Sequence, residues 1–438
     1  MINKLVFLFV FLMMLAGCQS RQTIVTFTSP DMQLSKAELK IGDLLFEESS
    51  DSSNVVLFEL NDVPTGYAIL QFGSTRKMIF LEQGKDLTVR FSRTVKPNTS
   101  RYSFEGELAP ENSYMEQQSR LPMISLNANS TEEEIIRQLN DTINQRKAVL
   151  QSLNLSPEFK RLESERQRYS ILRSFSRYNG WGNGLYPFLK GQLAENPELL
   201  ITEDYQAFLL DALYAIGGES GENTPYSYAA GQLDYIDQHL KDTTVIDFVL
   251  NSVLSKYMEK RGTESIDGFM EIFRTKARSH EVIQPIEELY GKYSRIAKGQ
   301  AIPEFTFLDV KDKEVALSSF KGKYVYIDCW ATWCGPCNLQ IPALQQLEHK
   351  YKGKDIVFVS ISRDSNRDKL KSMVRERKLG GVQLIEKLPT RSEFSDWFMI
   401  NAIPRFIILD KAGNVYDMNA PRPSDPTTEQ ILDRLLVL

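Results

Sequence analysis

Two cysteines with two residues between them are the part of this sequence best suited to chemistry. Cys334 and Cys337 have the spacing that lets a pair change between dithiol and disulfide with little backbone movement. A cysteine at the start of a helix is favoured as a thiolate by the free N–H groups and the positive end of the helix dipole. The intervening residues are Gly335 and Pro336, and a proline suits a first helical turn because its missing N–H would be unpaired there. The pattern predicts redox chemistry with Cys334 as the nucleophile.

A zinc site is the competing interpretation of a cysteine pair. Zinc requires four ligands, usually two such pairs or one pair with histidines. The other nearby thiol is Cys329, and His349 falls well along the segment that follows the pair. His239 and His280 share no ligand spacing with His349. We therefore expect redox chemistry without a metal ion and without a bound cofactor.

The cysteines are few and concentrated. The chain has four, and none occurs from Gln19 to Asp328. An exported protein that used disulfides as structural crosslinks would distribute them along the chain. Cys329 is left over, and we expect it to be a free, buried cysteine that behaves as a small hydrophobic residue.

The first residues have the pattern of an export signal. Lys4 precedes an unbroken apolar run, Leu5–Leu15, which is too short to cross a bilayer but suits a signal peptide. The run ends in Leu-Ala-Gly-Cys at Cys18, which resembles the bacterial lipobox. We predict a signal peptide over 1–17 and a lipid on Cys18; the alternatives are an ordinary signal peptide cleaved near Ala16 and an uncleaved anchor. The predicted location is the cell envelope, facing the periplasm, and Gln19 in place of Asp favours the outer membrane.

Composition defines the broad class of the remaining chain. Of 438 residues, 42% are hydrophobic and 25% are charged, which is typical of globular domains. The net charge of −5 argues against a nucleic-acid partner, because such proteins present basic surfaces. At roughly 100–200 residues per domain, the length predicts two or three domains.

Hydrophobic periodicity changes twice along the chain. Residues 22–106 contain strands of period two, such as Leu87–Phe91, and predict a small antiparallel sandwich or barrel. Residues 112–298 have helical spacing, as in Ile135–Leu150, and predict an all-α middle region. Residues 299–438 alternate short strands with helices and predict an α/β domain around a central sheet.

The elements expected in this last domain surround the cysteine pair. Strands are predicted at Phe305–Leu308, Tyr324–Asp328, Ile356–Ile361, Phe406–Leu409 and Val415–Asn419. Helices are predicted at Asn338–Tyr351, Arg367–Lys378, Glu393–Met399 and Thr428–Leu436. The charged run Arg363–Lys378 is interpreted as a solvated helix face.

With these elements in place, the site resembles that of thioredoxins, and more closely that of the exported TlpA/ResA-like family. Asp328, six residues before Cys334, matches a buried acid of thioredoxins, and Pro342 matches the proline that kinks the active-site helix. Ile403-Pro404 resembles the cis-proline that packs beside the cysteines, and Asp410–Gly413 resembles the hairpin that follows. The wider layout resembles Bacteroidetes lipoproteins that place a β-rich domain and a helical region before a thioredoxin fold.

This resemblance implies a thiol–disulfide oxidoreductase. Cys334 and Cys337 would form the redox-active disulfide, Asp328 would exchange a proton with Cys337, and Pro404 would complete the catalytic set. The site would be walled by Trp333, Gly335, Pro336 and Ile403. Its partners would be disulfide-containing proteins and a membrane electron donor of the DsbD or CcdA kind.

Two other functions are compatible with parts of the sequence. In the first, the large N-terminal and helical part binds a ligand or partner, and the dithiol is accessory. In the second, the fold serves a peroxidase, but Ala331 occupies the position of the threonine that such a site requires. A variant lacking both Cys334 and Cys337 discriminates the enzyme from the binding protein.

Overall fold

The computed structural model of the protein describes residues 21–93, 101–118, 130–176, 185–222, 224–387 and 392–437. The predicted signal peptide and Cys18 therefore lie outside the described residues. The chain divides into two compact units, Met1–Glu219 with Leu240–Val245, and Ser220–His239 with Ile246–Leu438. The helices of the middle region are divided between these units, and the domain boundaries drawn from the sequence stay predictions. In the described part of the chain, no helix combines the length and apolarity needed to cross a membrane.

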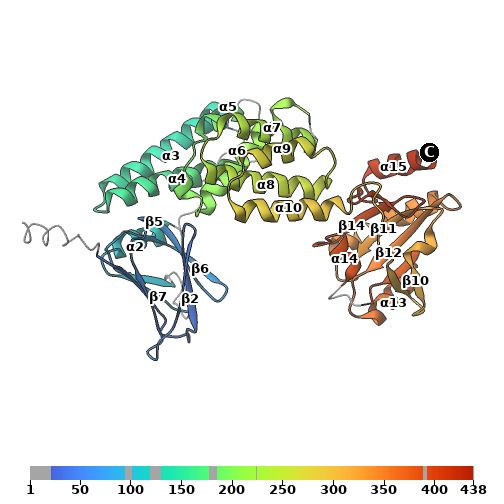
Figure 1. Ribbon diagram of the computed structural model, residues 1–438, viewed down its shortest axis with the longest axis horizontal. Helices are drawn as coiled ribbons and strands as arrows, with labels where there is room; N and C mark the ends of the chain where they lie inside the picture. The colour runs from blue at the N-terminus through green and yellow to red at the C-terminus, as the bar shows by residue number, and fades with distance from the viewer. Residues whose placement is uncertain are drawn as a thin grey trace, which may run out of the picture. The chain divides into compact units, whose positions relative to one another are not determined.

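The first unit begins with a β-sandwich (Figure 1). One sheet has the order β4-β1-β7-β8 and the other β3-β2-β5-β6. Their inner faces meet at Phe72, whose ring centroid lies 4.5 Å from that of Phe27 and 4.9 Å from that of Phe91. The strands are β1 (Thr23–Thr28), β2 (Lys36–Ile41), β3 (Leu44–Ser49), β4 (Val55–Leu60), β5 (Gly66–Phe72), β6 (Thr75–Leu81), β7 (Leu87–Phe91) and β8 (Tyr102–Glu105).

The predicted β-rich domain is confirmed, but the expectation of a purely antiparallel arrangement is wrong. Strands β1 and β7 pair in parallel, with Val25 opposite Leu87. Hairpins join neighbouring strands in opposite directions. Here β5 and β6 belong to the other sheet. The chain then returns to the first sheet as β7, which lies beside β1 and runs in the same direction as β1.

Helices follow the sandwich within the first unit. Helix α4 packs on the sandwich, where the Tyr67 hydroxyl donates a 2.7 Å hydrogen bond to Glu163. Glu163 is fully buried and forms a 2.8 Å ion pair with Arg166, which neutralises its charge. The elements are α2 (Ala109–Gln118), α3 (Glu132–Ser152), α4 (Pro157–Ser176), α5 (Leu185–Gln192), the 3-10 turn η1 (Pro197–Leu199) and α6 (Glu203–Gly217).

The remaining helices are α7 (Pro225–His239), α8 (Thr243–Arg261), α9 (Asp267–Lys276) and α10 (His280–Ser294). Asp242 caps the start of α8, since its carboxylate accepts hydrogen bonds from the N–H groups of Thr244 and Val245. Asp247 of α8 accepts from the backbone N–H groups of Arg278 and Ser279, just before α10 begins. These bonds join α8 to the start of α10. The predicted helical middle region is confirmed.

The second unit ends in a seven-stranded sheet of order β10-β9-β13-β12-β11-β14-β15. The inner strand β11 lies between β12, to which it is parallel, and β14, to which it is antiparallel. The strands are β9 (Thr306–Asp309), β10 (Glu314–Ala316), β11 (Tyr324–Trp330), β12 (Ile356–Ser362), β13 (Val382–Ile385), β14 (Arg405–Leu409) and β15 (Val415–Asp417). The strands predicted from the sequence did not include β10 and β13.

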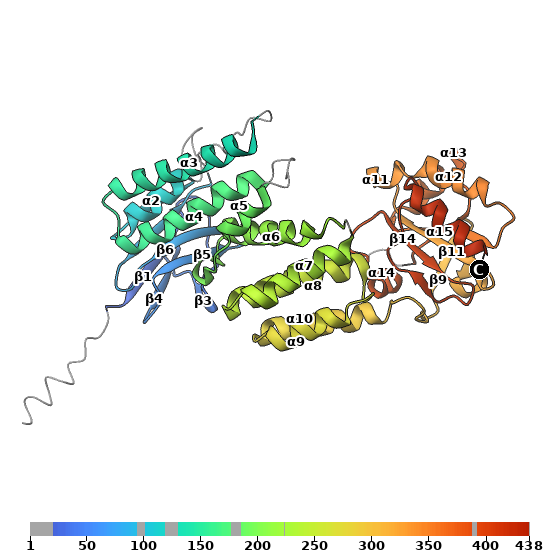
Figure 2. The same cartoon turned by 90° about the horizontal axis from the view of Figure 1, so that it is seen from above.

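The α-helices that the described residues form around this sheet are α11 (Gly335–Asn338), α12 (Ile341–Lys350), α13 (Arg367–Glu376), α14 (Glu393–Trp397) and α15 (Pro426–Val437). α12 and α15 cover one face, where Leu344 and Leu432 pack in a cluster with Tyr326 of β11 (Figure 2). The single helix expected over Asn338–Tyr351 begins instead at Ile341, with Pro342 in its first turn. The predicted α/β fold is confirmed.

Candidate active site

The cysteine pair lies where the chain leaves the inner strand β11 and enters α11. Cys334 is the N-cap of α11, and its Sγ accepts a 3.2 Å hydrogen bond from the backbone N–H of Cys337. The two residues form a disulfide with their Cα atoms 5.3 Å apart. A sulfur that accepts a helix N–H is stabilised as a thiolate when the disulfide is reduced. The local geometry therefore suits Cys334 for nucleophilic attack.

A buried aspartate holds the loop before the cysteines. The Asp364 carboxylate accepts hydrogen bonds from the backbone N–H of Thr332 at 2.8 Å and from its hydroxyl at 2.7 Å. The Asn338 amide donates to the Thr332 carbonyl from the other side, at 3.1 Å. The interpretation of Arg363–Lys378 as a solvated helix face is wrong for Asp364, which is 2% exposed. Asp364 lies between the end of β12 and the start of α13, and its carboxylate binds the loop at Thr332 instead of facing solvent.

The segment before β14 brings a backbone carbonyl to the disulfide. The Ile403–Pro404 peptide bond is cis, as expected. The carbonyl oxygen of Ile403 lies 3.8 Å from Sγ of Cys334. β14 is antiparallel to β11, with Arg405 opposite Cys329, which places Pro404 beside the end of β11. Backbone groups of a substrate segment could pair with this position next to the reactive sulfur.

Exposed apolar residues border the cysteines. The side chain of Trp333 is 65% exposed and that of Leu339 is 77% exposed. Gly335 and Pro336 are also exposed, whereas Trp330 is buried in a cluster with Cys334 and Cys337. The two tryptophans therefore have different roles: Trp330 is core, and Trp333 is free to contact a partner. Leu339 was missed in the sequence, where an isolated leucine in a helical segment indicates core.

Asp328 of β11 is a buried carboxyl group. Burial and, to a smaller extent, the negative charge of Glu348 raise its pKa to about 7, against the opposing effect of a hydrogen bond from Ser360. Burial also raises the pKa of Glu348, on α12, to about 7. Two carboxyl groups that titrate near neutral pH on neighbouring elements can exchange protons under working conditions.

Glu348 is the second residue that sequence reasoning missed. The available signal was its position, four residues after Leu344 and seven after Ile341, on the apolar face of α12. An acid on an apolar stripe is unusual, but it acquires meaning only when the residue that it faces is known. Here that residue is Asp328, on a strand distant in sequence.

Cys329 is free and 1% exposed, and burial raises the pKa of its thiol well above the ordinary value. These properties agree with the expected role as a small hydrophobic residue. Within the described ranges, no group of three or more His, Cys, Asp or Glu side chains could hold a metal ion.

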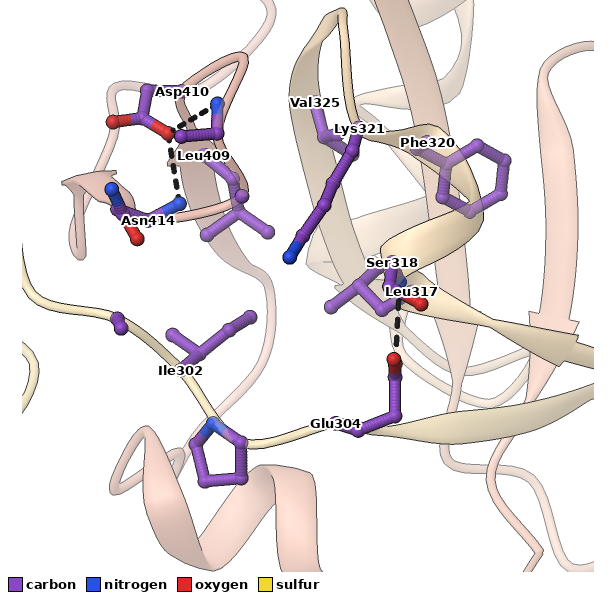
Figure 3. Close-up of a pocket in the computed structure, with 14 residues that line it drawn as sticks. Ile302, Glu304, Leu317, Ser318, Phe320, Lys321, Val325, Leu409, Asp410 and Asn414 are labelled. Carbon is purple, nitrogen blue, oxygen red and sulfur yellow. Dashed lines mark hydrogen bonds between the residues drawn. The ribbon is translucent and has the colours of Figure 1, made fainter.

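A separate pocket of about 210 Å³ lies at the opposite end of β11 (Figure 3). Val325, near the start of β11, lines it, and the Lys321 side chain extends into it. The two carboxylates that line this pocket already accept hydrogen bonds from the backbone. Glu304 accepts one from the N–H of Ser318, and Asp410 accepts one from the N–H of Asn414. The cysteines follow the other end of β11, so this pocket is not part of the redox site.

Comparison with known proteins identifies this region. The family described as Redoxin matches residues 297–436. The C-terminal domain is a Redoxin domain. Thiol-disulfide oxidoreductase ResA of Bacillus cereus is 29% identical over 126 residues, which cover 29% of this chain and 71% of ResA. The thioredoxin-like protein YneN of Bacillus subtilis is 28% identical over 151 residues, which cover 33% of this chain and 86% of YneN.

A solved structure from Bacteroides vulgatus, for which a thiol-disulfide oxidoreductase function has been suggested, is 38% identical to this chain. The match covers 33% of this chain and 99% of the solved chain, and the TM-score is 0.31. The Redoxin domain, with its relatives, makes the protein a thiol-disulfide oxidoreductase of the ResA/TlpA-like kind. The cysteine pair, Asp328 and Glu348 all lie within the residues that the Redoxin family matches.

Proposed function

We propose that the protein is an exported, lipid-anchored oxidoreductase that reduces disulfides of other proteins. The observation that carries this proposal is the Cys334–Cys337 pair at the start of α11, beside the Ile403 carbonyl and the exposed Trp333. Such a site can receive an extended protein segment and attack a disulfide within it. The substrates are therefore proteins, and no bound cofactor takes part.

The reaction has two exchange steps in which the dithiol gives two electrons to the substrate. The Cys334 thiolate attacks one substrate sulfur, the substrate disulfide breaks, and a mixed disulfide forms as the other substrate sulfur leaves as a thiolate. Cys337 then gives its proton to Asp328, and the resulting thiolate attacks Sγ of Cys334. The mixed disulfide breaks, the second substrate thiolate leaves, and Cys334 and Cys337 are oxidised to the disulfide. Solvent protons complete the two substrate thiols.

Pro404 and the residues around the disulfide position the substrate in this proposal. The Ile403 backbone pairs with the substrate chain, and Trp333 with Gly335 and Pro336 forms the wall against which the segment lies. A membrane electron donor of the DsbD or CcdA kind restores the dithiol. Such a donor is required because an oxidising compartment would otherwise leave the pair oxidised.

The direction of electron flow is testable through the reduction potential. Gly335 and Pro336 offer no side chain that can hydrogen-bond a thiolate, so Cys334 depends on the helix terminus alone. We expect a potential nearer the ~−270 mV of thioredoxin than the ~−120 mV of the oxidant DsbA. Equilibration of the purified protein against glutathione measures it. A potential above about −180 mV, the value of protein disulfide isomerase, would show that the protein oxidises its substrates instead.

Lipidation at Cys18 is the second test of this proposal. The apolar run that ends in Leu-Ala-Gly-Cys predicts a mature chain that begins at Cys18 and carries a diacylglyceryl group. Mass spectrometry of the mature N-terminus should detect this group, and a Cys18→Ala variant should lose it and leave the membrane fraction. An unmodified mature chain that begins elsewhere contradicts the anchor, while the exchange chemistry of the Redoxin domain would stand.

A further inference from the structure

Asp328 shares a small cavity with Glu348. The cavity has a volume of about 10 Å³ and is also lined by Ser360 of β12 and Gln383 of β13. This is roughly the space that one water molecule requires, and the polar groups needed to hold it are present. A carboxyl group on β11 and a second one on α12 therefore face the same water-sized space.

Two glycines leave the space that the Glu348 carboxyl group occupies. A Cβ atom on Gly380 would collide with Oε2 of Glu348, and one on Gly381 would lie 2.8 Å from Oε1. Gly381 also has a φ of +61°, which side chains rarely adopt. The turn between α13 and β13 thus leaves room for the Glu348 carboxyl group beside the cavity.

Exposure distinguishes the two acids. Asp328 is 7% exposed, whereas Glu348 is only partly buried. In the proposed reaction Asp328 takes a proton from Cys337 in every turnover and must lose it before the next. A carboxyl group that cannot reach bulk water exchanges its proton through a neighbour or an ordered water. Glu348 has one side in the cavity and access to solvent.

We propose that Glu348 relays protons between Asp328 and bulk water. Protonated Asp328 passes its proton through one water molecule to the Glu348 carboxylate. Asp328 is then ionised and Glu348 neutral, and Glu348 releases the proton to solvent. No covalent bond to carbon or sulfur changes, and no electrons move. The relay rests on the proposed function, because it is needed only if Asp328 accepts the proton of Cys337.

The electrostatic surroundings support such a transfer. The pKa values of both acids are raised to about 7, so moving a proton between them costs little. The polar side chains that line the cavity beside the two acids are uncharged: Ser360 of β12, Gln383 of β13 and Gln345 of α12. On β11 itself, the Asp328 charge raises the pKa values of Tyr326 and Cys329, both already raised by burial, and these groups therefore stay neutral.

The test uses full-length protein and a fluorescent peptide disulfide as substrate, with turnover measured at low buffer concentration between about pH 6 and pH 8. Glu348→Gln keeps the shape of the side chain but cannot carry a proton. We expect roughly tenfold slower turnover, less than the ~10²-fold or more of a direct general acid–base residue, because Glu348 acts on Asp328 and not on the reacting sulfur. Glu348→Asp retains a carboxyl group and should lose less. The matched control is Glu376→Gln, which removes an exposed acid from α13 and should leave the rate unchanged.

Added imidazole separates a relay from a structural role, because a small buffer can carry the proton that Glu348 no longer carries. We expect imidazole to restore the Glu348→Gln rate and to leave wild type unaffected. Carboxyl NMR of Asp328 should also show a lower pKa in Glu348→Gln and no change in Glu376→Gln. A Glu348→Gln rate equal to wild type, or a slow rate that imidazole does not restore, overturns the relay. In either case the proposed function still stands if the wild-type protein reduces the substrate and the Cys334→Ser variant does not.

Discussion

Cys334→Ser is expected to lose thiol–disulfide exchange by ~10⁴-fold or more, since removal of a covalent nucleophile eliminates the reaction path itself. A serine hydroxyl is not ionised at neutral pH and cannot form a disulfide with the substrate. The helix start that stabilises a thiolate at this position cannot compensate for the absent sulfur. The measurement is the rate at which full-length protein, supplied with a chemical reductant, reduces a peptide disulfide.

Cys337→Ala is the informative partner of this variant. It keeps the nucleophile but cannot resolve the mixed disulfide, so covalent complexes with substrates should accumulate and can be identified by mass spectrometry. Cys329→Ala is the matched control. It removes a buried thiol that takes no part in the exchange and keeps Cys337, so no complexes should accumulate. Complexes that form equally well without Cys334 would contradict the mechanism. Full cellular function in a variant without Cys334 and Cys337 would favour a binding protein with an accessory dithiol.

Asp328→Asn is expected to slow resolution of the mixed disulfide by ~10²-fold, the usual scale for a general acid–base group. Because the pKa of Asp328 is raised to about 7, the wild-type rate should rise as pH passes through that value and the base ionises. Asparagine cannot accept the proton, so the variant should lack this rise. Stopped-flow measurement of resolution across the pH range tests both expectations.

The same substitution should stabilise the fold at neutral pH. The folded pKa of about 7 exceeds the ~3.9 of an unfolded aspartate, so between these values the folded state binds more protons. Wild-type stability therefore falls as pH rises through this window, by ~1.4 kcal/mol per unit of pKa difference and up to ~4 kcal/mol at about pH 8. Asp328→Asn should escape this loss, and below about pH 4 the two proteins should differ little.

Denaturant unfolding at several pH values measures this difference, with the exposed acid Asp355 as the control in an Asp355→Asn variant. Unchanged resolution rates in Asp328→Asn would restrict Asp328 to a structural role. Equal unfolding free energies at neutral pH would show that its carboxyl group is not a buried, costly charge. Slower exchange together with higher stability is the result expected of a group kept for chemistry at the expense of the fold.

The sequence alone predicted the reactive cysteines and the order of the parts. The cysteine spacing is a local pattern whose chemistry follows from a few residues, and the resemblance to thioredoxins added Asp328 and the Ile403-Pro404 pair. Hydrophobic periodicity indicated the β-rich, helical and α/β regions, because burial of one face repeats along each element. Two short strands of the last domain, β10 and β13, were missed.

Tertiary structure decided which polar residues become buried and what they face. Glu348 is a solvated acid by its residue type, and it becomes a neighbour of Asp328 only because α12 packs across β11 and two glycines leave space. Asp364 belongs to a charged run, yet the loop at Thr332 covers it. Trp330 and Trp333 are three residues apart, and one is core while the other is exposed. Each outcome depends on segments distant in sequence, whose contacts no local pattern records.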